Sequence, residues 1–425
     1  MFAAPAGTRD IAVPRAAFAA LLLFAFLCPM TSWTIARGAL SYADFALVLS
    51  LLLMLPAIFS GRLLPFVPFF LVATGTCMLF IGLVSAEMED NLIGVLDCMK
   101  LVVAMMVTPL VVAWGLQDRP FTRAYWLLSA WLAGATFSAL VGISSRHGIS
   151  LLGFHDIHAA AGQRIFGLTY HSTSLGYCSA IALAAGLLLT LGTRSWLLRL
   201  LGLGSIGILL YAIHLSGSRA SVIGALSVLL PFMLFLLTRL HNLRLRIALF
   251  LGSAGVIGLI VVLALGGLPI DDPGSALGRL LGRNSSVQYS NSVREILHDY
   301  AWKGFFESPV FGRGFHNIRI AHNYTLQLLH SGGVLALFVV LAWALALLHS
   351  YLQTRGTVLR LDRPLREQLL WVTLTALFMG WFAHALTQTF ITDRNGYFWV
   401  TLILALGFHV RRLQLAHSPA VIARQ

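Results

Sequence analysis

The stretch Arg219–Arg239, RASVIGALSVLLPFMLFLLTR, decides the fold class of this chain. The 19 residues between its two arginines carry no charge. At about 1.5 Å of rise per residue, a helix of that length nearly spans the roughly 30 Å hydrocarbon core of a bilayer. Uncharged runs of about 20 residues recur along the chain, so the sequence predicts an all-α polytopic membrane protein.

The composition of the whole chain agrees with this prediction. Of 425 residues, 58% are hydrophobic and 11% are charged, whereas a soluble domain carries about 25% charged residues. These values exclude an ordinary soluble enzyme, a disordered chain and a disulfide scaffold. The formal net charge is +13, but nucleic-acid binding needs a soluble basic face, which the sequence does not offer. We therefore expect a lipid bilayer, and no nucleic acid, among the partners.

We predict a single transmembrane domain over residues 1–425, with about twelve helices. The predicted spans are 17–35, 41–59, 64–85, 92–115, 123–143, 172–191, 195–215, 219–239, 245–267, 329–351, 368–391 and 396–411. Arginines concentrate in alternate connections, and the positive-inside rule assigns those connections and both termini to the cytoplasm. The first span is expected to be retained, because no clear small-residue cleavage site accompanies it.

Two connections, 144–171 and 268–328, are too long for tight turns in a helical bundle, and both fall on the predicted outer side. Connections of this length are usually functional. The longer one is inserted between predicted spans nine and ten and contains an amphipathic helical pattern at Ser292–Lys303. A turn rich in Pro and Gly follows at Ser308–Gly314, and Ala321–Tyr324 begins a helical run that leads into a span.

Positive residues on the outer side run against the orientation rule, so each of them needs a reason. The candidates are Arg164, Arg219, Arg294 and Arg313. A guanidinium is always charged, and its planar fork donates two hydrogen bonds to phosphate oxygens. Several converging arginines would therefore hold a pyrophosphate. The alternative is that each side chain snorkels to lipid phosphates at the membrane surface.

His322 is the candidate for proton transfer, because an imidazole accepts a proton near neutral pH. A lone histidine in a loop is more often structural, so the role of His322 depends on its sequence context. His384 lies inside a predicted span, where ionisable groups indicate function. A neutral histidine hydrogen-bonded between helices is an equal alternative for His384. Asn323, Tyr324 and His171 are supporting candidates.

No metal site is expected from the acidic residues and histidines. The acidic turn Glu87–Asp90 is interpreted as solvated, and the pair Asp271–Asp272 as part of a loop. The pattern His155–His158 is a poor ligand set for a loop. The four cysteines fall in apolar stretches without metal-binding or redox spacing. We therefore expect the protein to work without a metal cofactor.

The candidate motifs occur in a definite order. A Ser-x-Ser-Arg sequence, Ser216–Arg219, lies at the outer end of a span. The long outer loop then holds Arg294, a Pro-x-Phe-Gly-x-Gly turn at Pro309–Gly314, and the pair His322 and Asn323. This arrangement resembles the O-antigen ligase and polymerase superfamily, and most of all the O-antigen ligases. The resemblance extends over most of the chain by hydropathy, but its specific motifs cover only these two regions.

The resemblance implies a GT-C-like, polyprenol-dependent glycosyltransferase of lipopolysaccharide biosynthesis, located in the bacterial inner membrane with its active site facing the periplasm. The donor would be O-antigen on undecaprenyl pyrophosphate, and the acceptor a sugar hydroxyl of lipid A-core. The family implies an inverting, metal-independent transfer with His322 as general base. Arg219 and Arg294 would hold the pyrophosphate, with Arg313 and Arg164 in support.

Other functions stay open at this stage. An O-antigen polymerase uses the same donor but extends the glycan on its carrier, and the pair beginning at His322 favours the ligase. Enzymes of this kind that glycosylate proteins often carry a longer C-terminal outer region. A transporter for lipid-linked glycan would show inverted repeats and charged or broken helices near the midplane. The sequence shows no repeat, and its polar candidates gather at one face.

Overall fold

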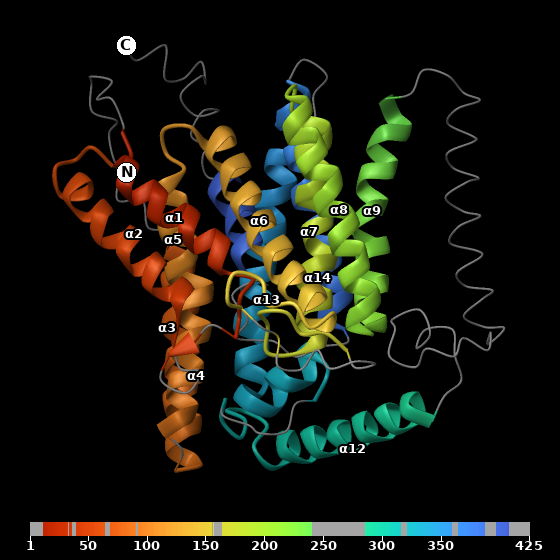
Figure 1. The fold of residues 1–425 in the computed structure, drawn as a ribbon. Coiled ribbons are helices and arrows are strands. Elements are labelled where there is room, and N and C mark those ends of the chain that lie inside the picture. Colours follow the sequence, from red (N-terminus) through yellow and green to blue (C-terminus); the bar gives the residue numbers. More distant parts are fainter. Residues whose placement is uncertain are drawn as a thin grey trace.

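The computed structural model shows a bundle of long helices with one helix lying across its end (Figure 1). It describes residues 12–32, 34–35, 40–63, 69–90, 92–154, 156, 164–239, 285–315, 321–358, 364–386 and 397–407. The predicted span 245–267 and the start of the longer loop, 268–284, lie outside the described residues, as do parts of the last two predicted spans.

Helices account for most of the described residues. In chain order they are α1 (Arg15–Leu27), α2 (Tyr42–Phe59), α3 (Phe69–Met88), α4 (Leu92–Val102), the π-helical segment η1 (Val103–Val107), α5 (Thr108–Gly115), α6 (Pro120–Arg146), α7 (Ser172–Gly192), α8 (Trp196–Ser216), α9 (Arg219–Arg239), α12 (Ser285–Glu307), α13 (Tyr324–Val358), α14 (Leu365–Ala385) and a final helix at Tyr397–Gly407. A small antiparallel hairpin pairs β1 (Thr34–Ile35) with β2 (Leu40–Ser41).

Within the described part of the chain, nine helical segments are long and apolar enough to cross a membrane. The protein is therefore an all-α polytopic membrane protein. Two further predicted spans correspond to shorter apolar helices, α1 and Tyr397–Gly407. The ninth predicted span, 245–267, lies outside the described residues, so the total of about twelve spans stays a prediction.

The first predicted span, 17–35, is wrong in its extent. Helix α1 covers Arg15–Leu27, 13 residues, which extend only about 20 Å. The helix ends there because Pro29 follows its C-cap residue Cys28, and proline has no backbone N–H with which to continue the helical hydrogen bonds.

Helix α7 lies at the centre of the bundle and packs against α6, α8, α9 and α14. It is the most buried of the candidate spans, because 78% of the residues in its apolar stretch are buried inside the protein. Small residues explain this position, because they let neighbouring helices approach closely. A Cβ added at Gly186 would lie 2.8 Å from Ile206 of α8, and one added at Gly176 would lie 2.7 Å from the Ser216 hydroxyl.

Helix α12 crosses one end of the bundle nearly at right angles to the long helices (Figure 1). The predicted amphipathic pattern at Ser292–Lys303 forms a longer helix than expected, Ser285–Glu307. Its buried face includes Ala301 and Gly304, whereas Ile296 is 65% exposed. The helix therefore lies with one face against the end of the bundle, which we call the α12 end.

The turn after α12 is joined to α13 backbone to backbone. Helix α13 breaks at Gly333, whose φ is +65°. The amides of Arg313 and Gly314 donate to the carbonyls of His330 and Ser331 at 2.7 and 3.0 Å, and the amide of Val334 donates to Pro309 at 2.9 Å. The break thus exposes backbone groups of α13, and the turn satisfies them.

Glycines make this approach of two backbones feasible. Gly312 has a φ of +70°, and a Cβ at that position would lie 2.6 Å from the Gly333 amide nitrogen. A Cβ at Gly333 would lie 2.7 Å from the Phe311 amide nitrogen. Side chains at either position would push the turn away from α13.

Charge is distributed unequally between the two ends of the bundle. We call the end of the bundle opposite α12, where α6 begins and α9 ends, the arginine-rich end (Figure 1). By the bounds of the helices, the segments at or next to this end carry Arg15, Arg62, Arg119, Arg123, Arg194, Arg199, Arg239, Arg355 and Arg366. At the α12 end the basic residues are accompanied by many carboxylates, among them Glu89, Asp156, Glu295, Asp299 and Glu307. This asymmetry follows the alternation of arginines predicted from the sequence.

We expect Gly312→Ala to destabilise the protein by about 2 kcal/mol or more, because it combines a left-handed backbone with a steric clash. Thermal unfolding of the purified protein in detergent measures this change. Gly204→Ala in α8 is the matched control, because nothing lies within 4 Å of its added Cβ. Equal melting temperatures for the two variants would contradict the backbone contact.

Candidate functional site

The Ser-x-Ser-Arg sequence builds the turn between α8 and α9 at the α12 end. Gly217 ends α8 with a left-handed φ of +62°. The Ser218 hydroxyl accepts a hydrogen bond from the Ser221 amide at 3.3 Å and lies 2.7 Å from the Ser221 hydroxyl. Such a hydroxyl caps the first turn of a helix. The motif therefore fixes Arg219 as the first residue of α9.

Arg219 connects the bundle to the crossing helix. Its Nη2 donates to the Asn291 side-chain oxygen of α12 at 3.0 Å. A cation at a helix N-terminus opposes the positive end of the helix dipole, at a cost of roughly 0.3–1 kcal/mol. The guanidinium and the helix terminus therefore both favour an anion at this point of the α12 end.

One face of α12 carries Asn291, Arg294, His298 and Ala301, which follow the three- and four-residue spacing of a helix. Arg294 and His298 are both half-buried. The Nε2 atom of His298 is buried and makes no hydrogen bond among the described residues. The sequence analysis missed His298, although its position four residues after Arg294 gave the signal.

His322 lies just before α13, in a constrained backbone. Its φ is +50°, a left-handed conformation that costs a residue with a side chain roughly 1–2 kcal/mol. The preceding residue, Ala321, packs with Ala301 of α12 and with Leu326. The half-buried His322 is therefore the residue next to Ala321, through which the start of α13 contacts α12.

The two residues after His322 have structural contacts. The Asn323 side chain accepts a hydrogen bond from the Leu326 amide at 3.0 Å and so caps α13. Tyr324 is buried, and its hydroxyl lies 2.6 Å from the Tyr397 hydroxyl in the final helix. Both residues hold the start of α13 in place, and their supporting role in the site stays a prediction.

The shorter predicted loop brings Arg164 to the same end of the bundle. Arg164 Nε donates to the carbonyl of Ser216, the last residue of α8, at 2.6 Å. The Asp156 carboxylate accepts from the amides of Phe166 and Gly167, both at 2.7 Å. Asp156, which the sequence analysis considered only as part of a poor metal pattern, therefore organises the segment next to Arg164.

His171 and His384 lie at the ends of the two central helices, α7 and α14, that are nearest α12. His171 precedes α7 and caps it by accepting from the Thr173 amide at 3.3 Å. His384 of α14 is 4% exposed and stacks on Tyr177 of α7, with ring centroids 4.1 Å apart. His384 therefore joins two spans by stacking near the α12 end, and both interpretations of this residue stay predictions.

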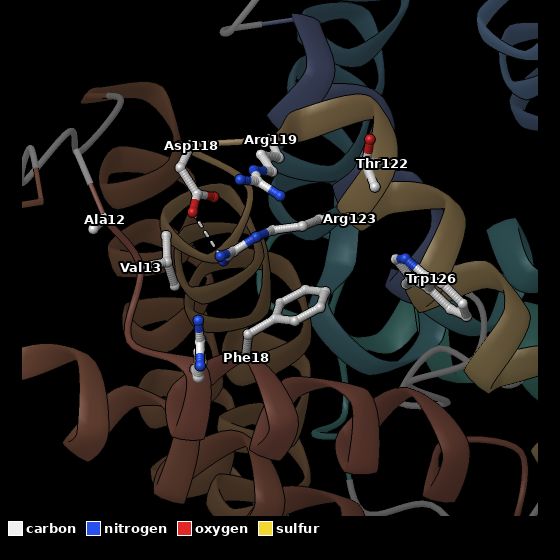
Figure 2. Close-up of a pocket in the computed structure, with 9 residues that line it drawn as sticks. Ala12, Val13, Phe18, Asp118, Arg119, Thr122, Arg123 and Trp126 are labelled. Carbon is white, nitrogen blue, oxygen red and sulfur yellow. Dashed lines mark hydrogen bonds and ion pairs between the residues drawn. The ribbon is translucent and has the colours of Figure 1, made fainter. Parts of the chain in front are cut away.

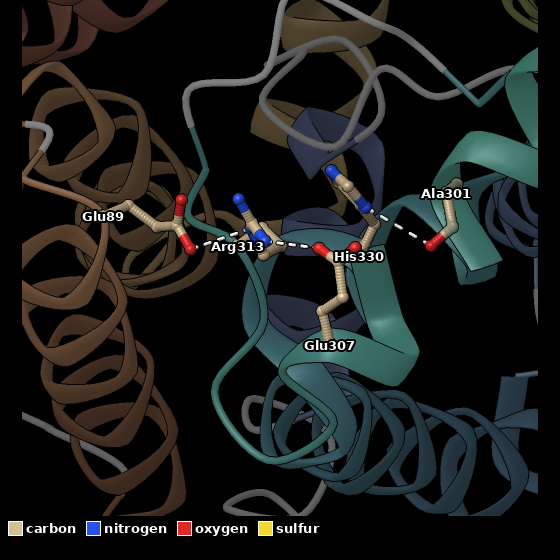
Figure 3. Close-up of polar contacts among 5 residues, drawn as sticks. All are labelled: Glu89, Ala301, Glu307, Arg313 and His330. Atoms are coloured by element: carbon tan, nitrogen blue, oxygen red, sulfur yellow. Dashed lines mark hydrogen bonds and ion pairs between the residues drawn. The ribbon is translucent and has the colours of Figure 1, made fainter. Parts of the chain in front are cut away.

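Arg313 is bound by two carboxylates, as Figure 3 shows. Its Nε lies 2.8 Å from Glu89 Oε1, and its Nη1 pairs with Glu307. Glu89 belongs to the acidic turn that we expected to be solvated. Glu87 and Asp90 are exposed, whereas Glu89 is half-buried in this ion pair. Arg313 thus joins α12 to the turn between α3 and α4, and its charge is already compensated.

His330 provides a second contact between α13 and α12. Its Nδ1 lies 3.3 Å from the Ala301 carbonyl oxygen (Figure 3), and its ring lies 5.3 Å from that of Tyr300. A Cβ at Gly304 would overlap the His330 ring. The absence of a side chain at Gly304 therefore leaves room for the His330 ring against α12. We assign His330 a role in packing.

The candidates fall into two groups along α12. Arg219 and Arg294 lie near Asn291, and His322 follows the Ala301 contact, about 15 Å further along the helix axis. His298 lies between these two groups on the same face. Arg164 is fixed to the end of α8 beside Arg219, whereas Arg313 is engaged elsewhere with Glu89 and Glu307.

Among the described residues, no three or more side chains of His, Cys, Asp or Glu gather in a way that suits a metal ion. His155 and His158 lie outside the described residues. The expectation of a metal-independent protein therefore stays a prediction.

No protein-family model and no curated protein matches this chain. The resemblance to O-antigen ligases therefore stays a prediction, and the function is argued from the geometry and chemistry of the α12 end.

We expect Glu89 and Arg313 to be energetically coupled, by up to about 1 kcal/mol because both side chains are partly exposed. A double-mutant cycle with Glu89→Gln and Arg313→Gln, read by chemical unfolding, measures the coupling. Strictly additive effects would show that the ion pair contributes nothing to the position of α12.

Proposed function

We propose that this protein is an O-antigen ligase. It transfers O-antigen polysaccharide from undecaprenyl pyrophosphate to a sugar hydroxyl of lipid A-core at the periplasmic face of the bacterial inner membrane. The reaction belongs to lipopolysaccharide biosynthesis and, on this proposal, inverts the anomeric centre without a metal ion. The bilayer supplies both lipid-linked substrates.

One observation supports the proposal above the others, namely the position of Arg219. It lies at the positive end of α9 and is held towards α12 through Asn291, three residues before Arg294. Two guanidiniums and a helix N-terminus at the membrane boundary suit an anion that carries several charges. A lipid-linked pyrophosphate is such an anion.

The distribution of arginines supports the proposed orientation. The arginine-rich end follows the positive-inside rule if it faces the cytoplasm. The α12 end, with Arg219, Arg294 and His322, then faces the periplasm. The described part of the chain begins near Arg15 at this end and finishes at Gly407, which packs against Ser350 in the last part of α13, and both positions agree with cytoplasmic termini in this arrangement.

The chemistry of the transfer requires a base and a stabilised leaving group. The acceptor hydroxyl attacks the anomeric carbon of the donor sugar, and His322 accepts the hydroxyl proton. The bond from that carbon to the pyrophosphate oxygen breaks, and its electron pair stays with the pyrophosphate. Arg219 and Arg294 stabilise the negative charge that develops there, with Arg164 in support and His298 as an additional donor.

Glycan transfer by the purified protein in liposomes tests the function. The liposomes contain undecaprenyl-pyrophosphate O-antigen and lipid A-core, and the assay asks which lipid carries the glycan afterwards. We expect glycan on lipid A-core, also in the presence of a chelator. Longer glycan on the carrier would identify a polymerase, and carrier movement without transfer would identify a transporter. No transfer by folded protein would overturn the proposal.

Removing the arginine of α9 or of α12 should slow transfer. We expect Arg219→Ala and Arg294→Ala each to lower the rate by about 10²–10³-fold, as the loss of a preorganised donor does. Arg194→Ala, an exposed arginine at the opposite end, is the matched control and should retain full activity. Unchanged transfer in both site variants would exclude a pyrophosphate clamp at these residues.

His322→Ala should lower the rate by about 10²–10⁴-fold, the usual contribution of a general base. His147→Ala serves as the control, since His147 is an exposed histidine at the same end of the bundle, and it should retain full activity. Near-full transfer by His322→Ala would show that another group accepts the proton.

A further inference from the structure

A cavity of about 360 Å³ lies at the arginine-rich end, between the starts of α1 and α6, far from α12. Figure 2 shows Asp118, Arg119 and Arg123 gathered at this cavity, with Phe18 beneath Arg123 and Trp126 to one side. Ala12, Val13, Arg15 and Thr122 complete the lining. A volume of this size suits a small ligand or the polar headgroup of a larger one.

The basic residues of the cavity differ in their contacts. Arg123 is paired with Asp118 at 2.6 Å, donates to the Gly115 carbonyl at 2.8 Å, and lies over the Phe18 ring. It is therefore held in place. In the part of the chain that the structure describes, no side-chain hydrogen bond or ion pair involves Arg15 or Arg119, and both are exposed. Their charges are available to a ligand.

The charge of the lining favours an anion. Asp118 compensates one of the three guanidiniums, so the cavity keeps an excess of positive charge. The ends of two helices add to it, because α1 and α6 both begin at this point and neither has a side-chain cap. Uncapped helix N-termini present backbone N–H groups and a positive dipole to an anion.

The position of the cavity indicates where such an anion comes from. The lining residues Arg119 and Trp126 belong to the start of α6, a candidate membrane span, so the cavity lies where that span meets the membrane surface. Trp126 is 48% exposed, and exposed tryptophans near span ends are typical of the lipid headgroup region. Phosphate groups of the lipids lie at this depth.

We propose that this cavity is a binding site for the phosphate of an anionic phospholipid headgroup, with Arg15 and Arg119 as its ligands and the Arg123–Asp118 pair as a fixed wall. The site is independent of the proposed glycosyl transfer and lies at the opposite end of the bundle. A zwitterionic headgroup fits less well, because its own cation is repelled by the arginines. Free phosphate shares the anionic chemistry but would need no membrane surface.

Native mass spectrometry of the detergent-solubilised protein tests the site. Phosphatidylglycerol and phosphatidylcholine are titrated separately, and the bound lipid is counted. We expect phosphatidylglycerol to bind at least about tenfold more tightly, and Arg15→Gln combined with Arg119→Gln to remove this preference, since each charge-assisted hydrogen bond is worth about tenfold in affinity or more. Arg194→Gln, an exposed arginine of the same end outside the cavity, should leave the preference unchanged.

The remaining outcomes each contradict the proposal. An equal loss in Arg194→Gln would show that the preference reflects the general charge of this end. Unchanged binding in a double variant that keeps the wild-type melting temperature would exclude the cavity. Inorganic phosphate that displaces phosphatidylglycerol at comparable concentrations would identify a soluble anion as the ligand.

Discussion

The contact between the turn after α12 and the break in α13 is the constraint on which the α12 end depends. Two backbones approach so closely there that side chains at Gly312 or Gly333 would clash. The hydrogen bonds of this contact replace those that α13 loses where it breaks. Without it, α12 would be held across the bundle by side-chain contacts alone, such as those of Arg219 and His330, and the relation of Arg294 and His298 to Arg219 would be looser. The glycine-rich motif therefore has a structural function of its own.

The polar residues of the α12 end divide into those that build the end and those that remain available for chemistry. Three of these side chains make contacts that stabilise the fold. Arg313 pairs with two carboxylates, His330 lies against a carbonyl of α12, and Asn323 caps a helix. Arg219 stands at a helix terminus that would favour an anion instead. Its position opposes the local dipole, and such an unfavourable placement is typical of sites where function has priority over stability.

The fold class could be predicted from hydropathy, since uncharged runs of this length need a membrane. The boundaries of α2 and α9 agree with the prediction almost to the residue, because charges or caps flank those runs. The extent of α1 could not be predicted from hydropathy alone, because Pro29 ends a helix inside an apolar run. The candidate residues could be named from the sequence, but the engagement of Arg313 could not, because its partner Glu89 lies far away in the sequence and only folding brings the two together. His298 could have been found, because it lies four residues after Arg294 and therefore on the same face of α12.

The attachment of α12 has a mechanical consequence. The helix is held tightly near Gly304, where α13 packs against it, and by the Arg219 side chain near Asn291, about 20 Å away along its axis. A helix is a stiff rod, so a tilt of a few degrees about the tight attachment displaces the distant part by about 1–2 Å. The geometry acts as a lever, in which slight adjustments of the backbone at the glycine turn become displacements of hydrogen-bond scale beside Arg219.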